Sequence, residues 1–280
     1  MSSLLQKLLA GLSSQPEVPT IALLTDFGTR DSYVGAVKAV IATINPNARV
    51  IDIAHNVRAH DVREGAYALW SSFRFFPRGT IFVAIVDPGV GSSREILIVE
   101  AGEYTFLAPE NGLLDLVLSD EGASRIHSVR TSDEDGRWKR YSLAKVSRTF
   151  QGRDVFAPFA AHLSLGVRPE QIGEDRAVLV PSTTFCDPQT GIGKPKLLHI
   201  DRFGNLITNI RFNAESPRIA GLRVGRQPVR TWIASYEEAP PGSPCLISGS
   251  SGLVEVVAGG ASAARELKAT MDTQLTLLVK

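Results

Sequence analysis

Apolar residues in the first half of the chain alternate between short continuous runs and helically spaced sets. The runs 21–24, 49–53 and 80–86 each have the length of one buried strand. After the first run, apolar residues recur at the spacing of one helix face as far as Ile44, and after the second run as far as Phe73. This alternation predicts a mostly parallel sheet covered by helices on both faces.

The next part of the chain continues the same region. Two apolar runs, 95–99 and 104–107, flank a turn at Gly102 and indicate a hairpin. The further elements expected are a helix over about 112–118, a strand within 141–150 and a helix over 151–166.

The pattern changes after about Glu174. A stretch rich in Pro, Thr and Gly covers 178–193, and the rest of the chain holds short apolar runs separated by turn residues. These runs are 196–200, 206–210, 222–224, 229–233, 245–247, 253–257 and 275–279. Short strands with frequent turns predict a small antiparallel barrel or sandwich. We therefore expect a flexible lead over 1–19, a Rossmann-like α/β domain over 20–180 and a second, antiparallel β domain over 193–280.

Composition narrows the possible partners. The chain has 280 residues and a formal net charge of +1, which gives no electrostatic footprint for nucleic acid or an anionic membrane. Its two cysteines, Cys186 and Cys245, have no metal-binding spacing. The apolar stretch 4–12 is interrupted by polar residues and too short to span a bilayer. We expect a cytoplasmic protein without a membrane anchor.

Acidic residues stand where the first and third apolar runs end. Asp26 follows the first, and Asp87 follows the third in the segment Asp87-Pro-Gly-Val-Gly-Ser-Ser-Arg94. Ligands of open α/β sheets bind at the carboxyl ends of the strands, where Asp26 is well placed to receive ribose hydroxyls. The glycines let the loop return Arg94 towards Asp87. The alternative is a simple ion pair that fixes the turn.

Three further loop clusters carry candidate chemistry. They are Gln151-Gly-Arg-Asp154, Asp201-Arg-Phe-Gly-Asn205 and Gly249-Ser-Ser-Gly252. Asp31 lies near the start of the first predicted helix, where a helix cap is the simpler explanation.

These segments together resemble the S-adenosylmethionine hydroxide adenosyltransferases, whose relatives include fluorinase and chlorinase enzymes. The resemblance covers nearly all of 20–270. It rests on Leu24-Thr-Asp-Phe-Gly28, Asp61-Val-Arg-Glu-Gly-Ala66, Val86-Asp-Pro-Gly-Val-Gly91, Ala108-Pro-Glu-Asn-Gly-Leu-Leu114, Thr149-Phe-Gln-Gly-Arg-Asp-Val-Phe-Ala-Pro158, Asp201-Arg-Phe-Gly-Asn-Leu-Ile-Thr-Asn209 and Gly249-Ser-Ser-Gly252. It implies an N-terminal α/β domain, a C-terminal β-barrel, and a homotrimer with active sites between neighbouring subunits.

The family displaces methionine from S-adenosylmethionine by attack at the ribose C5′, and with water the products are adenosine and methionine. No cofactor is needed, because the sulfonium is already a good leaving group and the task is to position one nucleophile. The resemblance implies that Asp26 binds the ribose diol. It also implies that Phe203 and Asn205 bind adenine. Asp201, Ser250 and Ser251 would bind the methionine end, and Asp31 and Asn111 would assist. The fluorinase has an arginine at the position of Ser251.

One position departs from the hydrolytic members, which are similar in placing an Asp, an Arg and a His around the attacking water. Asp87 and Arg94 match the first two, but Gln151 stands in place of the histidine. Glutamine donates and accepts hydrogen bonds without taking up a proton near neutral pH. The catalytic group expected here is Asp87, Arg94 and Gln151.

Other functions remain open at this point. A protein that binds S-adenosylmethionine or adenosine without turnover is the main alternative, because of Gln151. A metal-dependent hydrolase using Asp26, Asp52 and Asp87 is less favoured, because the chain has no phosphate loop and no His pair at metal spacing. Halogenation is disfavoured too, since the carboxylate of Asp87 would repel a halide.

Overall fold

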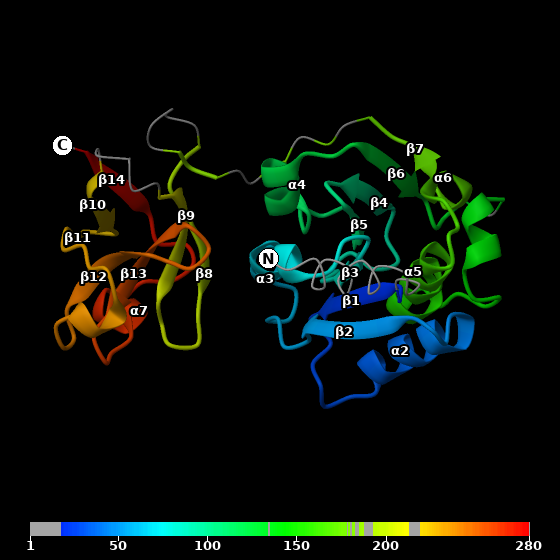
Figure 1. The fold of residues 1–280 in the computed structure, drawn as a ribbon, viewed down its shortest axis with the longest axis horizontal. Coiled ribbons are helices and arrows are strands. Elements are labelled where there is room, and N and C mark those ends of the chain that lie inside the picture. The colour runs from blue at the N-terminus through cyan, green and yellow to red at the C-terminus, as the bar shows by residue number, and fades with distance from the viewer. Residues whose placement is uncertain are drawn as a thin grey trace, which may run out of the picture.

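A seven-stranded sheet forms the N-terminal part of the protein, with the strand order β2-β1-β3-β5-β4-β6-β7 (Figure 1). The computed structural model describes residues 18–133, 135–177, 179, 181–182, 185–187, 193–212 and 219–279. Most of the expected 1–19 lead and much of the expected boundary at 180–193 lie outside these residues. The strands are β1 (Thr20–Thr25), β2 (Arg49–Ala54), β3 (Ile81–Ile85), β4 (Ile96–Ala101), β5 (Tyr104–Pro109), β6 (Arg125–Val129) and β7 (Glu174–Asp175).

The direction of the strands confirms a mostly parallel sheet. Strands β2, β1, β3 and β5 are parallel neighbours. Strand β4 is antiparallel to both β5 and β6, so β6 runs in the same direction as β5. Strand β1 has β2 on one side and β3 on the other, so the chain reverses its order of strand addition there. Such a switch point is where open α/β sheets bind ligands.

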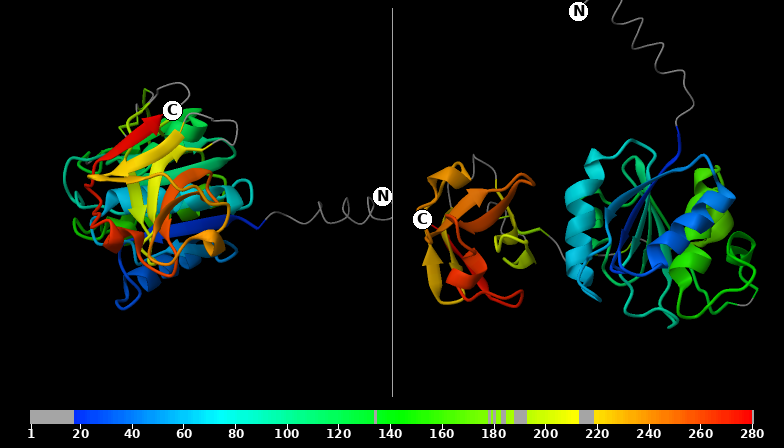
Figure 2. Two further views of the ribbon diagram at one scale, coloured as in Figure 1. Left: turned by 90° about the vertical axis from the view of Figure 1, so that its left-hand side faces the viewer. Right: turned by 90° about the horizontal axis from the view of Figure 1, so that it is seen from below.

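Helices cover both faces of this sheet, as Figure 2 shows. Helices α2 (Tyr33–Ile44) and α5 (Ala157–Ser164) pack on one face, and α3 (Val62–Ser72) and α4 (Asp115–Glu121) on the other. Alternate residues of β1 pack on the two faces of the sheet, because successive side chains of a strand point in opposite directions. Leu23 joins the core under α2 and α5, and Leu24 the core under α3 and α4.

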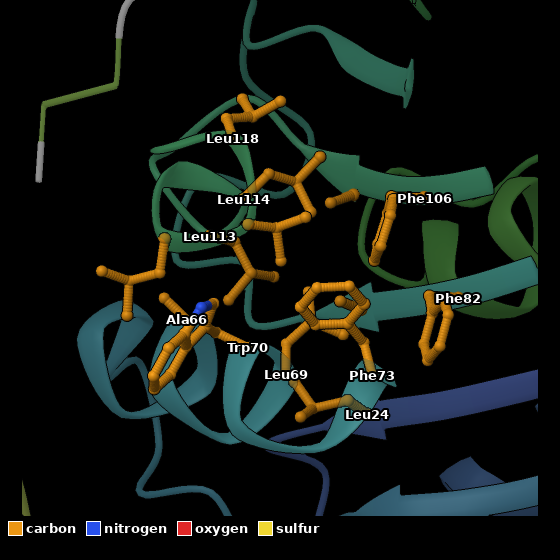
Figure 3. Packing of buried hydrophobic residues seen from close by; sticks show 14 of the residues in the cluster. Leu24, Ala66, Leu69, Trp70, Phe73, Phe82, Phe106, Leu113, Leu114 and Leu118 are labelled. Carbon is orange, nitrogen blue, oxygen red and sulfur yellow. The ribbon is translucent and has the colours of Figure 1, made fainter. Parts of the chain in front are cut away.

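The second of these cores is rich in aromatic side chains. Phe82 and Phe106 stack with ring centroids 4.9 Å apart, and Phe73 meets Phe106 edge to face at 5.7 Å. Figure 3 shows this packing with Leu69 and Trp70 of α3. Such burial holds the strand ends that carry Asp26 and Asp87 in a fixed frame.

The predicted strand within 141–150 is wrong. A 3₁₀ turn (Arg137–Tyr141) leads into an irregular segment whose backbone N–H groups bond to Asp154: Leu143 N donates to its carbonyl oxygen at 2.9 Å, and Ser147 N to its carboxylate at 2.7 Å. The apolar residues of the segment pack on the core without joining the sheet. Strand β6 was not predicted, because Arg125, His127 and Ser128 interrupt its apolar pattern.

The C-terminal part consists of antiparallel sheets. One has the order β12-β13-β9-β8 and the other β11-β10-β14. The strands are β8 (Leu197–Ile200), β9 (Leu206–Arg211), β10 (Ile219–Val224), β11 (Gln227–Val229), β12 (Pro244–Ser248), β13 (Leu253–Ala258) and β14 (Leu275–Val279). A short helix, α7 (Ala263–Glu266), follows β13. Closure of the two sheets into one barrel stays a prediction.

The two parts meet through a mixed apolar and charged contact. Phe185 packs on Trp70 with ring centroids 4.7 Å apart and belongs to the core beneath α3. Asp120, at the end of α4, accepts a hydrogen bond from Trp70 Nε1 at 2.8 Å and pairs with Arg74 and with Arg211 of β9. Burial raises the pKa of Asp120, but these three donors outweigh burial and lower it below its usual range.

We expect Asp120→Asn to lower the free energy of unfolding by about 2 kcal/mol at pH 7, because it removes charge-assisted bonds at a site only 10% exposed. A carboxylate with a lowered pKa stabilises the fold above its unfolded pKa of about 3.9 and loses this contribution as pH falls through its folded value. The difference between variant and wild type should therefore shrink below about pH 4. Urea unfolding at several pH values measures it.

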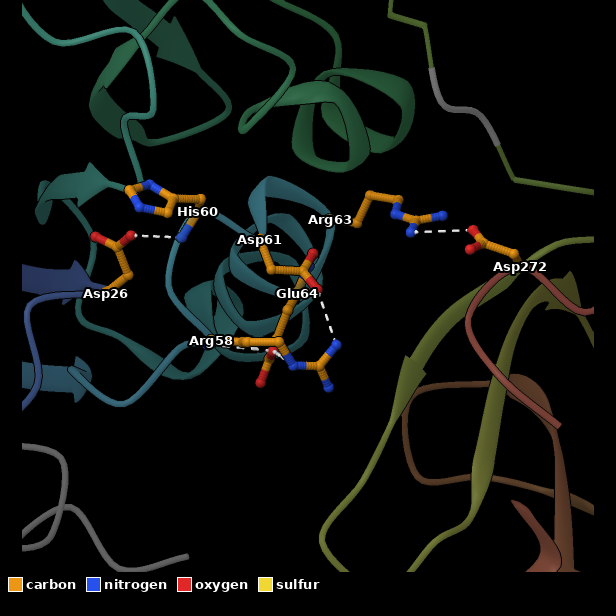
Figure 4. Close-up of polar contacts among 7 residues, drawn as sticks. All are labelled: Asp26, Arg58, His60, Asp61, Arg63, Glu64 and Asp272. Carbon is orange, nitrogen blue, oxygen red and sulfur yellow. Dashed lines mark hydrogen bonds and ion pairs between the residues drawn. The ribbon is translucent and has the colours of Figure 1, made fainter. Parts of the chain in front are cut away.

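The matched control is Asp272→Asn. Asp272 pairs with Arg63 at 3.5 Å across the same two parts, but its side chain is 87% exposed (Figure 4). We expect a change below about 0.5 kcal/mol. Equal losses of unfolding free energy for the two substitutions would show that the Asp120 contacts stabilise the fold no more than an exposed ion pair does.

Candidate active site

The carboxyl ends of β1 and β3 open onto a cavity of about 290 Å³. Its polar lining includes Asp26, His60, Asp87 and Gln151. The site residues predicted from the two strand ends therefore share one cavity at the switch point of the sheet.

Asp87, Arg94 and Gln151 form one buried hydrogen-bonded group. Arg94 Nε donates to both carboxylate oxygens of Asp87, at 3.0 and 2.9 Å, and Arg94 Nη2 donates to Asp87 Oδ2 and to Gln151 Oε1. The side chains of Asp87 and Arg94 are 6% and 9% exposed, and Gln151 is 4% exposed. Asp87 and Gln151 line the cavity, and Arg94 joins them. The structure thus brings together all three residues of the expected catalytic group.

Local backbone geometry explains this convergence. Gly91 has φ +77°, and a Cβ there would lie 2.6 Å from the carbonyl oxygen of Arg148. Only glycine lets the loop pass this close and return Arg94 to Asp87. Gln151 directly precedes a π-helical turn (Gly152–Phe156) at the start of α5. Such turns often occur at functional sites.

Asp26 is held by the loop that follows β2. Its Oδ2 accepts a hydrogen bond from the backbone N–H of His60 at 2.9 Å (Figure 4). His60 has φ +67°, a conformation that costs free energy in a residue other than glycine. Gly28 N donates to the carbonyl oxygen of His55 at 2.7 Å, which ties the two loops together. The Asp26 carboxylate is thereby fixed at the rim of the cavity.

A chain of polar contacts, buried at Thr25 and His55 and partly exposed at Asp52 and Lys38, supports the same loop. Thr25 Oγ1 and His55 Nδ1 lie 2.9 Å apart, and His55 Nε2 lies 3.0 Å from Asp52 Oδ1. Asp52 also pairs with Lys38 at 2.7 Å. Burial raises the pKa of Asp52, and the bonds from Lys38 and His55 more than reverse this and lower it. His55 therefore has a structural role next to Asp26.

Three aromatic rings border the cavity. Phe27, Tyr33 and Phe150 meet edge to face, with centroid distances of 5.2 to 6.1 Å. A Cβ on Gly152 would lie 3.1 Å from the Phe27 ring, so glycine allows this approach. The rings give the cavity an apolar wall beside the carboxylates.

Two predicted assisting residues lie elsewhere. Asp31 is exposed and precedes Ser32, the N-cap of α2. Asn111 Nδ2 donates to the carbonyl oxygen of Val86 at 2.8 Å, and its Oδ1 accepts from Leu113 N. Asn111 lines a different cavity, of about 430 Å³, between α3, α4 and the C-terminal part. The structure does not bring either residue to the cavity of Asp87.

The loop between β8 and β9 holds a second group. Asp201 Oδ1 accepts from the backbone N–H groups of Phe203 and Asn205, each at 2.9 Å, and Oδ2 accepts from Asn205 Nδ2 at 2.9 Å. These three residues line a cavity of about 930 Å³, and Phe203 is 70% exposed. A rigid loop therefore presents an exposed aromatic ring beside a carboxylate.

Ser250 and Ser251 lie in the turn between β12 and β13. Ser250 is exposed and Ser251 is half-buried. Nearby, burial and the charge of Asp201 raise the pKa of Glu255, whose Oε2 accepts from Tyr236 Oη at 3.3 Å. Sequence reasoning did not single out Glu255, because its position within an apolar strand gave no signal.

The Asp87 group and the Asp201 group line different cavities. The residues that line the cavity of Asp87 all belong to the N-terminal part, and those that line the cavity of Asp201 all belong to the C-terminal part. The two groups of predicted site residues are therefore separate from each other in this chain.

The described residues contain neither a cluster of metal-binding side chains nor a membrane-spanning helix. There, no group of three or more His, Cys, Asp or Glu side chains is arranged to hold a metal ion. No helix in that part of the chain is long and apolar enough to cross a membrane.

Comparison with solved structures supports the architecture. An uncharacterized conserved protein from Thermotoga maritima superposes with a TM-score of 0.79 and 31% identity, over 91% of this chain and 98% of that chain. A conserved hypothetical protein from Thermus thermophilus gives a TM-score of 0.74 and 33% identity, over 93% and 100%.

Comparison with curated sequences and family models identifies the family. An (R)-S-adenosyl-L-methionine hydrolase from Thermus thermophilus is 36% identical over 91% of this chain and 98% of its own length. One from Salinispora arenicola is 36% identical over 92% and 97%, and a fluorinase from Actinopolyspora mzabensis is 28% identical over 74% and 76%. Models of the N- and C-terminal domains of SAM hydroxide adenosyltransferase match residues 21–173 and 196–276. The chain belongs to the SAM hydroxide adenosyltransferase family.

Proposed function

We propose that this protein hydrolyses S-adenosylmethionine to adenosine and methionine, with Asp87 beside the attacking water. The observation that carries the proposal is the buried Asp87–Arg94–Gln151 group at the sheet switch point, in a chain that aligns along nearly its whole length with hydrolases of this substrate. The substrate in this proposal has the (R) configuration at the sulfonium, as in the (R)-S-adenosyl-L-methionine hydrolases that the chain resembles.

The reaction needs one nucleophile placed in line with the C5′–S bond. The water oxygen attacks C5′, the C5′–S bond breaks, and its electron pair stays on sulfur as the neutral thioether of methionine. The water loses a proton as the new C–O bond forms, and the Asp87 carboxylate is an acceptor on the cavity wall. The Arg94 guanidinium fixes that carboxylate through three hydrogen bonds. The aromatic wall limits water around the attacked carbon.

The remaining predicted residues bind the substrate in this proposal. Asp26 holds the ribose diol, and Phe203 with Asn205 holds adenine, since an exposed ring suits base stacking. Asp201, Ser250 and Ser251 hold the methionine end. Asp31 and Asn111 assist only if the bound state moves them, because neither lines this cavity.

These two groups, as half-sites, support an assembly in which one subunit's N-terminal part faces its neighbour's C-terminal part. We propose the homotrimer that the family resemblance implies. We also propose that the chain divides into an α/β domain over 20–180 and a β-barrel domain over 193–280. It also includes a cytoplasmic location, which the two free cysteines fit.

An isotope assay tests the reaction. The purified protein is incubated with S-adenosylmethionine in H₂¹⁸O, and we expect adenosine with ¹⁸O at the 5′ oxygen in many equivalents per subunit. Binding without turnover would favour the non-catalytic alternative. Loss of activity with a chelator would favour a metal-dependent hydrolase, and 5′-halo-adenosine in chloride or fluoride buffer would favour a halogenase.

A further inference from the structure

We propose that Thr131 is a positioning residue, which fixes the side-chain amide of Gln151 with its oxygen on Arg94. Thr131 follows β6 and lies outside the motifs that marked the site. Its Oγ1 accepts a hydrogen bond from Gln151 Nε2 at 3.0 Å. The inference deepens the proposed hydrolase function and rests on it.

The polarity of the amide follows from its two neighbours. A guanidinium only donates hydrogen bonds, so the atom of Gln151 next to Arg94 Nη2 must be the carbonyl oxygen. The amide nitrogen then points the other way and needs an acceptor. Thr131 supplies that acceptor, because a hydroxyl oxygen accepts as well as donates.

Burial makes this choice of orientation strict. Gln151 is 4% exposed, so an amide nitrogen without an acceptor would be left without water. A flipped amide would place its N–H₂ against the N–H groups of Arg94, donor against donor. With Thr131 present, one orientation satisfies both ends of the amide.

The orientation matters because Arg94 depends on it. Among the described residues, Arg94 Nη1 is buried and has no hydrogen-bond partner, so Asp87 and Gln151 are the hydrogen-bonding partners that hold the guanidinium. If Gln151 turns away, Arg94 keeps Asp87 alone and the carboxylate at the cavity wall becomes less fixed. The chain Thr131–Gln151–Arg94–Asp87 therefore connects a loop residue to the group that faces the attacking water.

The test compares kcat and KM for S-adenosylmethionine in Thr131 variants. We expect Thr131→Val to lower kcat about tenfold, the ratio that corresponds to one lost buried hydrogen bond, with KM within about twofold. Thr131→Ser keeps the hydroxyl and should stay within about twofold of wild type. If Thr131→Val folds poorly, Thr131→Ala, which adds no bulk, takes its place and should lower kcat by the same factor. Thr43→Val removes a hydroxyl from the exposed side of α2 and should change nothing.

A double-mutant cycle separates positioning from a general effect on folding. Gln151→Met keeps the length of the side chain and removes the amide, so Thr131→Val should cost less than about twofold in kcat in that background. Equal losses in both backgrounds, or equal losses for Thr131→Ser and Thr131→Val, would overturn the proposal. If Gln151→Met is too slow to assay, the comparison of Ser with Val decides.

A readout that does not use activity distinguishes this proposal from the hydrolase function. In protein labelled with ¹⁵N-glutamine, Gln151→Met identifies the Gln151 side-chain signal by its loss. We expect slow hydrogen exchange of this amide in wild type and Thr131→Ser, and exchange at least about tenfold faster in Thr131→Val. Fast exchange in wild type would refute the fixed amide even if the enzyme turns over. Slow exchange without turnover would instead refute the hydrolase function.

Discussion

Replacing Asp87 with asparagine should lower kcat for S-adenosylmethionine hydrolysis by about 10³-fold, within the range usual for general acid–base groups. Asparagine has nearly the same shape but lacks the charge and the second acceptor oxygen. Its amide nitrogen would also face the guanidinium of Arg94, which now bonds to both Asp87 oxygens. KM should change little, because in the proposed mechanism Asp87 faces the attacking water and not the adenine or methionine ends of the substrate. Single-turnover and steady-state kinetics measure the two effects.

The control must separate lost chemistry from lost stability. Arg94 is 9% exposed, so removing its counter-ion leaves a nearly buried charge and should cost about 3 kcal/mol of unfolding free energy. Adding Arg94→Met to Asp87→Asn removes the unpaired charge. The double variant should regain most of the stability and none of the activity. A single Asp87→Asn variant within about tenfold of wild-type kcat would show that the proton acceptor lies elsewhere.

Subunits with Asp26→Ala and subunits with Asp201→Ala should each be inactive, and should recover about a quarter of wild-type activity when mixed equally, dissociated and reassembled. In a closed ring, each interface joins the N-terminal half-site of one subunit to the C-terminal half-site of the next. With random mixing, about one interface in four receives both intact halves. Activity after native separation of the mixed assemblies measures the recovery.

The matched control mixes Asp26→Ala with Asp87→Asn. Both substitutions lie in the same cavity, so no interface in that mixture contains an intact N-terminal half-site. No activity should return. Recovery in this control, or its absence when mixed Asp26 and Asp201 assemblies demonstrably form, would contradict a site shared between subunits.

The sequence allowed the sheet to be predicted where the apolar signal was continuous. Strands β1 and β3 carry buried residues at every position, and the acids after them were correctly expected to face one crevice. The segment 141–150 misled the prediction, because its apolar residues pack on the core while its backbone bonds to Asp154. Apolar spacing reports burial, and it does not say which partner takes the backbone hydrogen bonds.

The charged residues of the site could be predicted from the sequence, but the residues that hold them in place could not. Asp87 and Arg94 are seven residues apart, so a glycine-containing loop already indicated their contact. Thr131 and Gln151 are 20 residues apart, and nothing local marks a threonine as the acceptor of a buried amide. The backbone N–H of His60 donates to Asp26, which lies 34 residues earlier in the chain, and no local pattern marks this contact either. Such supports depend on the tertiary fold, which brings distant loops together.

The contact at Asp120 has a consequence for how rings of this protein would close. Asp120 and Phe185 join the two parts of the chain, and in the proposed ring the angle between these parts would recur in every subunit. A small deviation of this angle in each subunit adds up around the ring, so the total deviation must be absorbed by the interface that closes the ring. Damage to this contact, although outside both cavities, should produce open chains of subunits with one vacant half-site at each end.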